Sequence, residues 1–166
     1  MEIIKKLSIV VSVYNEEAVL DKFYQAIYPV VQSLDSDYEL IFVNDGSKDA
    51  SPAILDRLAM DSHKVKVIHF SRNYGHEAAM IAGIDYSSGD GVICMDADLQ
   101  HPVECIPQIL DTFNQGYEVI SMVRTANKSA GLIKNVTSEL FYKLLNKISD
   151  THFEENASDF FAVTRK

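Results

Sequence analysis

Two acidic residues stand two positions apart where an apolar run ends, in the segment Asp96-Ala97-Asp98-Leu99-Gln100. If that run is a strand that finishes in a turn, both carboxylates can face one small volume, where they repel each other unless a cation lies between them. Asp and Gln oxygens are the hard ligands that Mg²⁺ and Mn²⁺ take, particularly beside phosphates. The spacing predicts a divalent cation site at Asp96, Asp98 and Gln100, with two solvated turn carboxylates as the alternative.

Three other apolar runs are also followed directly by polar or ionisable residues. Tyr14 and Glu16 come after the first run, Asp45 after the second and Arg72 after the third. Taken alone, the segment 44–47 (Asn-Asp-Gly-Ser) also suits an ordinary turn. Because ligands bind at the carboxyl ends of the strands in open α/β sheets, the coincidence of four such ends predicts an active site along this edge.

The sequence lacks the glycine-rich phosphate loops of dinucleotide-binding Rossmann domains and of P-loop proteins. It offers instead Asp45 for a base or ribose, and Asp96 and Asp98 for a metal. Arg72 and Arg124 are candidates for bidentate contact with phosphate. These residue types fit a nucleotide diphosphate whose leaving group must be neutralised.

The elements that position these residues follow from the hydrophobic pattern. Short β-branched runs alternate with helical periodicity, which predicts a single α/β domain with a Rossmann-like, mostly parallel sheet and helices on both faces. Asn15 is expected to cap the first helix, whose buried stripe extends to Leu34. The predicted strands are 7–13, 38–44, 65–70, 91–97, 117–123 and 159–164, and the further predicted helices are 51–61, 75–87 and 103–115.

The composition limits the classes of partner. The 166 residues are 47% hydrophobic and 23% charged and carry a net charge of −9, which indicates a globular domain with a real core. An evenly acidic chain is a poor binder of nucleic acid, so we expect no nucleic-acid partner. No apolar run reaches the roughly 18–20 residues of a membrane span, so the chain alone is expected to be soluble. Cys94 and Cys105 are expected to be buried free thiols.

One segment departs from the acidic background. Residues 124–147 contain five Lys or Arg residues and one Glu, and residues 131–148 form the most amphipathic stretch of the chain. The stretch can be an ordinary helix packed on the domain, or an interfacial helix resting on anionic lipid. The sequence leaves both interpretations open.

Four motifs occur in order along the chain: V-x-V-Y-N-E at 11–16, V-N-D-G-S-x-D at 43–49, S-R-N-x-G-x-x-A-A at 71–79 and M-D-A-D-L-Q-H-P at 95–102. Together they resemble the family 2 glycosyltransferases of GT-A fold. Within that family the chain is similar to the polyprenyl-phosphate glycosyltransferases, such as dolichyl-phosphate mannose synthases and bactoprenol glucosyltransferases. The resemblance covers nearly the whole chain.

This resemblance implies an inverting transfer from a nucleotide-sugar, with a UDP-sugar favoured over a GDP-sugar, to a polyprenyl phosphate, and Mg²⁺ or Mn²⁺ as the cofactor. It implies a donor-binding part over residues 1–123 and an acceptor-side helix and last strand over 124–166. It also implies metal ligands at Asp96, Asp98 and Gln100. The residues that would bind the nucleotide-sugar are Tyr14, Glu16, Asp45, Arg72 and Asp96.

On the acceptor side, the resemblance places Asp159 and Arg124 at the reaction. Two departures from the usual pattern stand out, because Val103 replaces a proline and Phe161 replaces an arginine. The first should be mild, whereas the second removes a cation that would otherwise contact the acceptor phosphate. His76, His101 and His152 are expected to be surface or helix-cap residues.

Relatives in this branch continue past the last strand into membrane helices. We therefore expect that the chain is truncated at its C-terminus and that the full-length protein is anchored at the cytoplasmic side of the membrane. Two alternatives remain: a family 2 transferase with a saccharide or another soluble acceptor, or a sugar-nucleotide-binding fragment without catalysis.

Overall fold

The computed structural model describes residues 3–123 and 157–165, with the backbone alone for residues 157 and 158. Within these ranges the chain forms six strands, four α-helices and one short 3₁₀ helix. The elements are β1 (Lys6–Val13), α1 (Leu20–Gln32), β2 (Asp37–Asn44), α2 (Ser51–Asp61), β3 (Val65–His69), α3 (His76–Tyr86), β4 (Gly91–Asp96), the 3₁₀ helix η1 (Val103–Cys105), α4 (Ile106–Asn114), β5 (Val119–Val123) and β6 (Ala157–Thr164).

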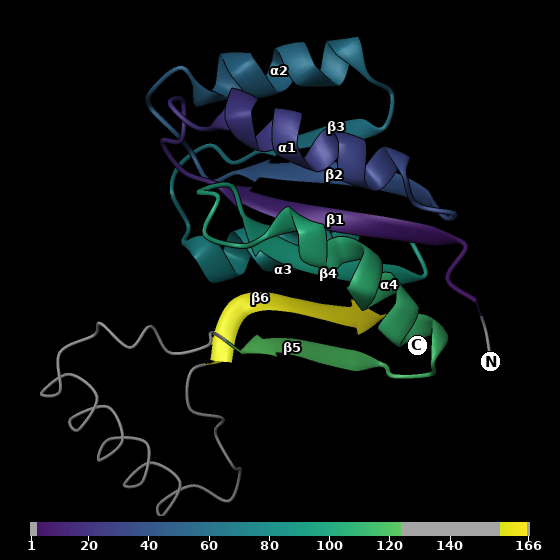
Figure 1. Cartoon of the computed structure of the whole chain (residues 1–166). Helices are drawn as coiled ribbons and strands as arrows, with labels where there is room; N and C mark the ends of the chain where they lie inside the picture. The colour runs from purple at the N-terminus through teal and green to yellow at the C-terminus, as the bar shows by residue number, and fades with distance from the viewer. Residues whose placement is uncertain (1–2, 124–156, 166) are drawn as a thin grey trace, which may run out of the picture. The chain divides into compact units, whose positions relative to one another are not determined.

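The strands form one sheet in the order β3-β2-β1-β4-β6-β5 (Figure 1). β1 pairs in parallel with both β2 and β4, and β2 pairs in parallel with β3. β6 runs antiparallel to β4, with Phe161 opposite Cys94 and Thr164 opposite Gly91. Because β1 to β4 are parallel, their carboxyl ends meet at one edge of the sheet. The predicted α/β architecture with a mostly parallel sheet is confirmed.

Helices cover both faces of the sheet, as predicted. α3 packs on β1 and β2, and its Ala79 and Met80 join a buried cluster that includes Ile41 of β2. Phe42 follows Ile41 and therefore points to the opposite face. There it meets Phe23 of α1 edge to face, with ring centroids 6.1 Å apart. α1 also contacts α2 and α4, so these three helices form the layer opposite α3.

A buried carboxylate joins three strands near their amino ends. Glu39 of β2 is only 2% exposed, and its Oε2 lies 2.8 Å from the Nζ atoms of both Lys6 and Lys66. Its Oε1 accepts hydrogen bonds from Ser8 Oγ at 2.6 Å and from the backbone N–H of Ser88 at 2.7 Å. Burial alone raises the pKa of Glu39, but these partners outweigh burial and hold the pKa well below its ordinary value.

The predicted helix over residues 51–61 is confirmed with the same bounds, and every predicted strand agrees within two residues. Two predictions are wrong. Asn15 does not cap a helix, because α1 begins at Leu20 and its N-cap residue is Val19. Asn15 itself has a positive φ of 55°. The single helix predicted over 103–115 is divided into η1 and α4. Pro107 has no N–H to donate to the carbonyl of Val103, which accepts from the N–H of Ile106 instead and closes a 3₁₀ turn.

The chain divides into two compact units, one of residues 1–120 with 159–166 and one of residues 121–158. Almost all of the second unit falls outside the described residues. Arg124, His152 and the predicted amphipathic helix over 131–148 therefore lie outside the described part of the chain.

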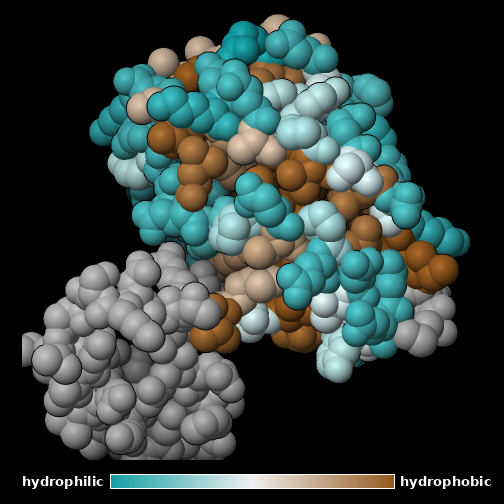
Figure 2. Space-filling view, in the orientation of Figure 1, coloured by the Kyte–Doolittle hydropathy of each residue, from teal (hydrophilic) through white to brown (hydrophobic). Residues whose placement is uncertain are grey.

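One face of the described part of the chain is mainly polar. Figure 2 shows hydrophilic residues over most of the visible face, with smaller hydrophobic areas between them. Cys94 is a buried free thiol, as predicted, whereas Cys105 is free but only half-buried. Among residues 3–123 and 157–165, no helix is both long enough and apolar enough to cross a bilayer.

Candidate active site

The carboxyl ends of the parallel strands surround a cavity of about 310 Å³. Its walls come from segments that lie far apart in the sequence: the ends of β1, β2 and β4, the loop after β3 and the start of α3. The lining residues are Ser12, Tyr14, Glu16, Asp45, Asn73, His76, Asp96, Ala97 and Asp98. Five of the residues predicted for the site therefore line one cavity.

The acidic segment after β4 has the turn that the two-residue spacing requires. Asp96 is the last residue of β4, and Leu99 has a φ of 62°, so the chain reverses directly after Asp98. Asp98 Oδ1 accepts a hydrogen bond from the backbone N–H of Gln100 at 2.9 Å, as in an Asx turn. Asp96 and Asp98 both line the cavity, whereas Gln100 is exposed and is absent from the lining.

Asp45 is buried, and it fixes the loop that leads into α3. Its Oδ1 accepts from the N–H of Tyr74 at 2.6 Å, and its Oδ2 accepts from the N–H of Gly75 at 3.0 Å. Beside it, Gly46 has a φ of 68° and presses against the backbone of Arg72, where an added Cβ would lie 2.3 Å from the carbonyl carbon. The loops after β2 and β3 are thus held together by backbone contacts.

The loop after β1 is joined to the loop after β2 in the same way. The N–H of Asn15 donates to Ser47 Oγ, and Asn15 Oδ1 accepts from the N–H of Lys48, both at 2.9 Å. The N–H of Glu16 donates to Ser51 Oγ at 2.9 Å. These bonds fix the backbone on both sides of Asn15, and so they position Tyr14 and Glu16 at the cavity.

A hydrogen-bonded chain supports the second loop from behind. Asn44 Oδ1 accepts from the N–H of Ser47 at 3.0 Å, and Asn44 Nδ2 lies 2.9 Å from His69 Nδ1. His69 Nε2 in turn lies 3.0 Å from Asp56 Oδ1 on α2. Since Asn44 Nδ2 can only donate and Asp56 Oδ1 can only accept, His69 is assigned as the tautomer protonated at Nε2.

The cavity has an excess of negative charge. Burial raises the pKa of Glu16, and the charges of Asp98, Asp49 and Asp96 raise it further. Burial also raises the pKa of Asp96; His76 and His101 oppose this, whereas Asp98 and Asp159 add to it. A divalent cation beside these oxygens would relieve the repulsion. The residues present therefore fit the predicted cofactor.

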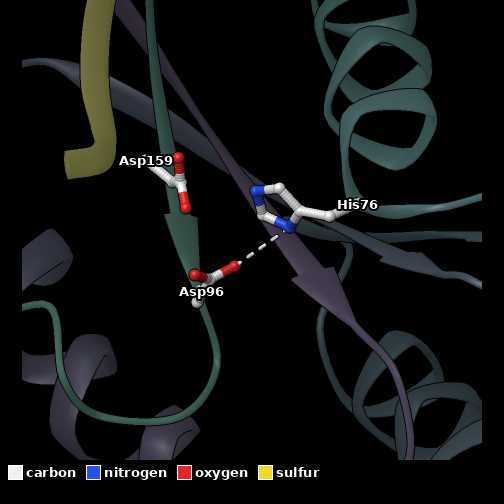
Figure 3. Close-up of side chains that lie close together, drawn as sticks. All are labelled: His76, Asp96 and Asp159. Carbon is white, nitrogen blue, oxygen red and sulfur yellow. Dashed lines mark ion pairs between the residues drawn. The ribbon is translucent and has the colours of Figure 1, made fainter. Parts of the chain in front are cut away.

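Asp159 reaches this edge from β6. Figure 3 shows its carboxylate near Asp96 of β4 and His76, the first residue of α3. One candidate ligand atom from each of the three side chains lies within 4.8 Å of the other two. His76 Nδ1 is 3.3 Å from Asp96 Oδ1 and 3.1 Å from Ser12 Oγ. β6 thus brings Asp159 to the carboxylate at the end of β4.

Two histidines that were expected to be surface or helix-cap residues lie at the site, and for His101 the expectation is wrong. His101 is buried, accepts a hydrogen bond from the N–H of Asp96 at 3.0 Å, and stacks on Phe160 with ring centroids 5.1 Å apart. His76 lines the cavity. A signal for His76 was present, because a helix that follows a parallel strand begins at the edge where the strand ends.

Of the two predicted phosphate-binding arginines, the structure describes only Arg72, which is not among the residues that line the cavity. The Arg72 guanidinium lies 4.8 Å from the centre of the Tyr74 ring, outside the cavity lining, and Arg124 is outside the described residues. Phe161, which replaces the expected arginine, is half-buried and packs against the cluster under α3.

Two larger cavities, of about 550 and 740 Å³, lie at the opposite edge, beside the residues that precede β1. They contain none of the residues that follow the four parallel strands. Residues that follow the parallel strands line instead the smaller cavity of about 310 Å³.

Residues 8–166 match the sequence profile of the family described as Glycosyl transferase family 2. This chain is a member of glycosyl transferase family 2. It is 43% identical over 159 residues to the uncharacterised glycosyltransferase YkcC of Bacillus subtilis (strain 168), a match that covers 96% of this chain and 49% of that protein. It is 40% identical over 161 residues to the bactoprenol glucosyl transferase of Shigella phage SfV, covering 97% and 52%. The chain spans about half the length of these relatives.

Solved structures share the fold. The mannosyltransferase PcManGT from Pyrobaculum calidifontis, solved with GDP-Man and Mn²⁺, superposes with a TM-score of 0.64 at 17% identity, covering 99% of this chain and 45% of that one. Glucosyl-3-phosphoglycerate synthase from Mycobacterium tuberculosis, solved with Mn²⁺, UDP-glucose and phosphoglyceric acid, gives 0.67 at 19% identity, covering 97% and 57%. The GT-A arrangement expected from the motifs is confirmed.

Proposed function

We propose that this chain forms the catalytic portion of an inverting glycosyltransferase that moves a sugar from a nucleotide diphosphate-sugar to a polyprenyl phosphate. The observation that carries the proposal is the convergence of Glu16, Asp45, Asp96 and Asp98 on one cavity in a member of family 2. The relatives named bactoprenol glucosyl transferase, at about 40% identity, support the lipid phosphate acceptor.

In this proposal, residues 1–123 hold the donor. Tyr14, Glu16 and Asp45 contact the nucleoside. Both oxygens of Asp45 already accept backbone N–H groups, but each carboxylate oxygen has a second lone pair, so Asp45 can still accept from a base or ribose. A UDP-sugar is favoured over a GDP-sugar, and Arg72 is assigned to the donor phosphates.

A divalent cation, Mg²⁺ or Mn²⁺, fits the acidic end of the cavity, with Asp96, Asp98 and Gln100 as its proposed ligands. When bound, the cation supplies positive charge that stabilises the departing diphosphate. Asp96 and Asp98 hold it at the end of β4, where burial raises the pKa of Asp96 and the charges of Asp98 and Asp159, which a cation would offset, raise it further.

In the reaction, an oxygen of the acceptor phosphate forms a bond to the anomeric carbon while the bond from that carbon to the diphosphate oxygen breaks. The nucleoside diphosphate leaves and the configuration inverts. A phosphate monoester has a second pKa near 6, so the acceptor is already ionised at neutral pH and needs no strong general base. Asp159 therefore acts mainly by positioning groups, together with Arg124.

Residues 124–166 form the acceptor side. The proposal assigns the basic amphipathic stretch 131–148 to an anionic membrane surface and the reaction to the cytoplasmic side of the membrane. Each Lys or Arg near such a surface contributes about 1 kcal/mol to binding.

The test is transfer of labelled glucose from UDP-glucose, with Mn²⁺, to undecaprenyl phosphate, compared with undecaprenol and a soluble oligosaccharide. We expect product with the lipid phosphate alone, and a loss on the order of a hundredfold or more in Asp98→Ala. Asp85→Ala, which removes an exposed carboxylate from α3, is the matched control. Transfer to the oligosaccharide would favour a soluble acceptor, and donor binding without any transfer would favour a binding fragment.

The same assay tests Asp159. Near-normal transfer to the lipid phosphate by Asp159→Asn would exclude a base role. Thermal shifts with UDP- and GDP-sugars, with and without Mn²⁺, test the donor assignment. No shift with any donor would contradict the proposed donor site.

A further inference from the structure

Three side chains from separate elements converge beside the cavity, and one of them contributes nitrogen. His76 begins α3, Asp96 ends β4 and Asp159 lies on β6, and Figure 3 shows the three directed toward a common space. Their candidate ligand atoms all lie within 4.8 Å of one another. Two ligands on opposite sides of a cation with bonds of about 2.1–2.2 Å are roughly 4.3 Å apart, so small side-chain movements suffice to close the set.

The imidazole of His76 is oriented for this task. Its Nδ1 lies 3.3 Å from Asp96 Oδ1 and 3.1 Å from Ser12 Oγ, so one ring nitrogen is engaged at the ends of β4 and β1. Figure 3 shows the other ring nitrogen on the side of Asp159. The imidazole therefore faces both carboxylates of the cluster.

The backbone that carries His76 is also held in place. Asp45 accepts hydrogen bonds from the N–H groups of Tyr74 and Gly75, directly before the helix starts. His76 is half-buried, with 34% of its side chain exposed. A ligand on the first turn of an anchored helix loses little conformational freedom when it binds a cation.

We propose that His76 is a nitrogen ligand of the divalent cation, acting with Asp96 and Asp159, and that it biases the site toward Mn²⁺ over Mg²⁺. The inference rests on the cation of the proposed function and adds ligands to its set. Mg²⁺ takes oxygen ligands and keeps its waters, whereas imidazole suits the transition metals better. Through Asp159, the cation would also connect β6 to the donor side.

The test measures Mn²⁺ binding by the paramagnetic resonance signal of free Mn²⁺, and nitrogen coordination by pulsed resonance of bound Mn²⁺, with and without UDP. In the wild-type chain we expect coupling from a directly bound imidazole nitrogen. His76→Asn should abolish the coupling and weaken Mn²⁺ binding on the order of tenfold or more. Because the amide oxygen is a hard ligand, Mg²⁺ should then compete more effectively than in the wild type.

His63→Asn removes an exposed histidine between α2 and β3 and should change neither measurement. His76→Gln, which keeps a polar side chain but no imidazole, must also lose the coupling, and thermal unfolding checks that both variants are folded. Three outcomes would each overturn the inference: Mn²⁺ that binds without nitrogen coupling, coupling that survives in His76→Asn, and no Mn²⁺ binding at all. If UDP-glucose still stabilises the wild-type chain in an Mn²⁺-dependent manner while coupling is absent, the inference fails and the proposed function stands.

Discussion

Glu39→Gln should destabilise the fold in a way that depends on pH. The substitution keeps the size of the side chain but removes its charge at a position that is 2% exposed. The carboxylate receives two lysine ammonium groups at 2.8 Å, from Lys6 and Lys66, together with bonds from Ser8 and Ser88. A glutamine offers one oxygen and one NH₂ group, so at least one of these donors faces another donor.

The expected loss at neutral pH is about 2–3 kcal/mol. Hydrogen bonds to charged groups contribute about 1.5–3 kcal/mol each. The lysine side chains are 30% and 35% exposed, so water can replace part of the hydrogen bonding that each ammonium group loses. The contribution of each bond is therefore taken at the lower end of the range.

The pH dependence follows from the lowered pKa of Glu39. The contribution of this carboxylate is fully present above its ordinary pKa of 4.5 and is lost as the pH falls from there toward its lower folded-state pKa. The stability difference between the wild type and Glu39→Gln should therefore be largest near pH 7 and should narrow below about pH 4.5.

The assay is urea unfolding of both proteins at neutral pH and near pH 3.5, with Glu77→Gln as an exposed control on α3. Equal stability of the wild type and Glu39→Gln at neutral pH would refute the reasoning, and so would a difference that stays constant across the pH range.

Three further predictions concern other parts of the fold. Gly46→Ala should lower the free energy of unfolding in urea by at least about 2 kcal/mol, because the φ of Gly46 is 68° and the new Cβ would lie 2.3 Å from the Arg72 backbone. Unchanged stability would contradict this close approach. Burial raises the pKa of the Cys94 thiol to about 12, so the half-buried Cys105 should react first with a disulfide reagent at pH 8, and the reverse order would show that β4 is accessible. His69→Ala should weaken donor binding several-fold in a thermal-shift titration by loosening the loop after β2, whereas an unchanged affinity would mean that the bonds of His69 do not support that loop.

The strand-end residues were predictable because periodicity and turn chemistry are local properties. The sequence shows directly an apolar run that ends at Asp96 and an Asn-Asp-Gly-Ser segment after the second run. A parallel sheet then places both at one edge. The cavity at that edge confirms this reasoning.

The side-chain partners were not predictable in the same way, because they depend on which segments meet in three dimensions. Asp45 bonds to the backbone N–H groups of Tyr74 and Gly75, about thirty residues along the chain. His101 is buried against Phe160, a contact that exists only because β6 enters the sheet beside β4. Asn15, a good helix cap by type, adopts a positive φ because its side chain and N–H bond to the next loop instead.

The position of β6 bears on how the protein folds during synthesis. β6 follows β5 in the sequence, yet it lies between β4 and β5 in the sheet, so it enters only after residues 157–164 have left the ribosome. Until then β4 keeps an unpaired edge, which is a template for pairing with another chain. The pairing of β6 with β4 is thus a step of high contact order, and the same step brings Asp159 to Asp96, so the cluster at the site can form only once β6 is in place.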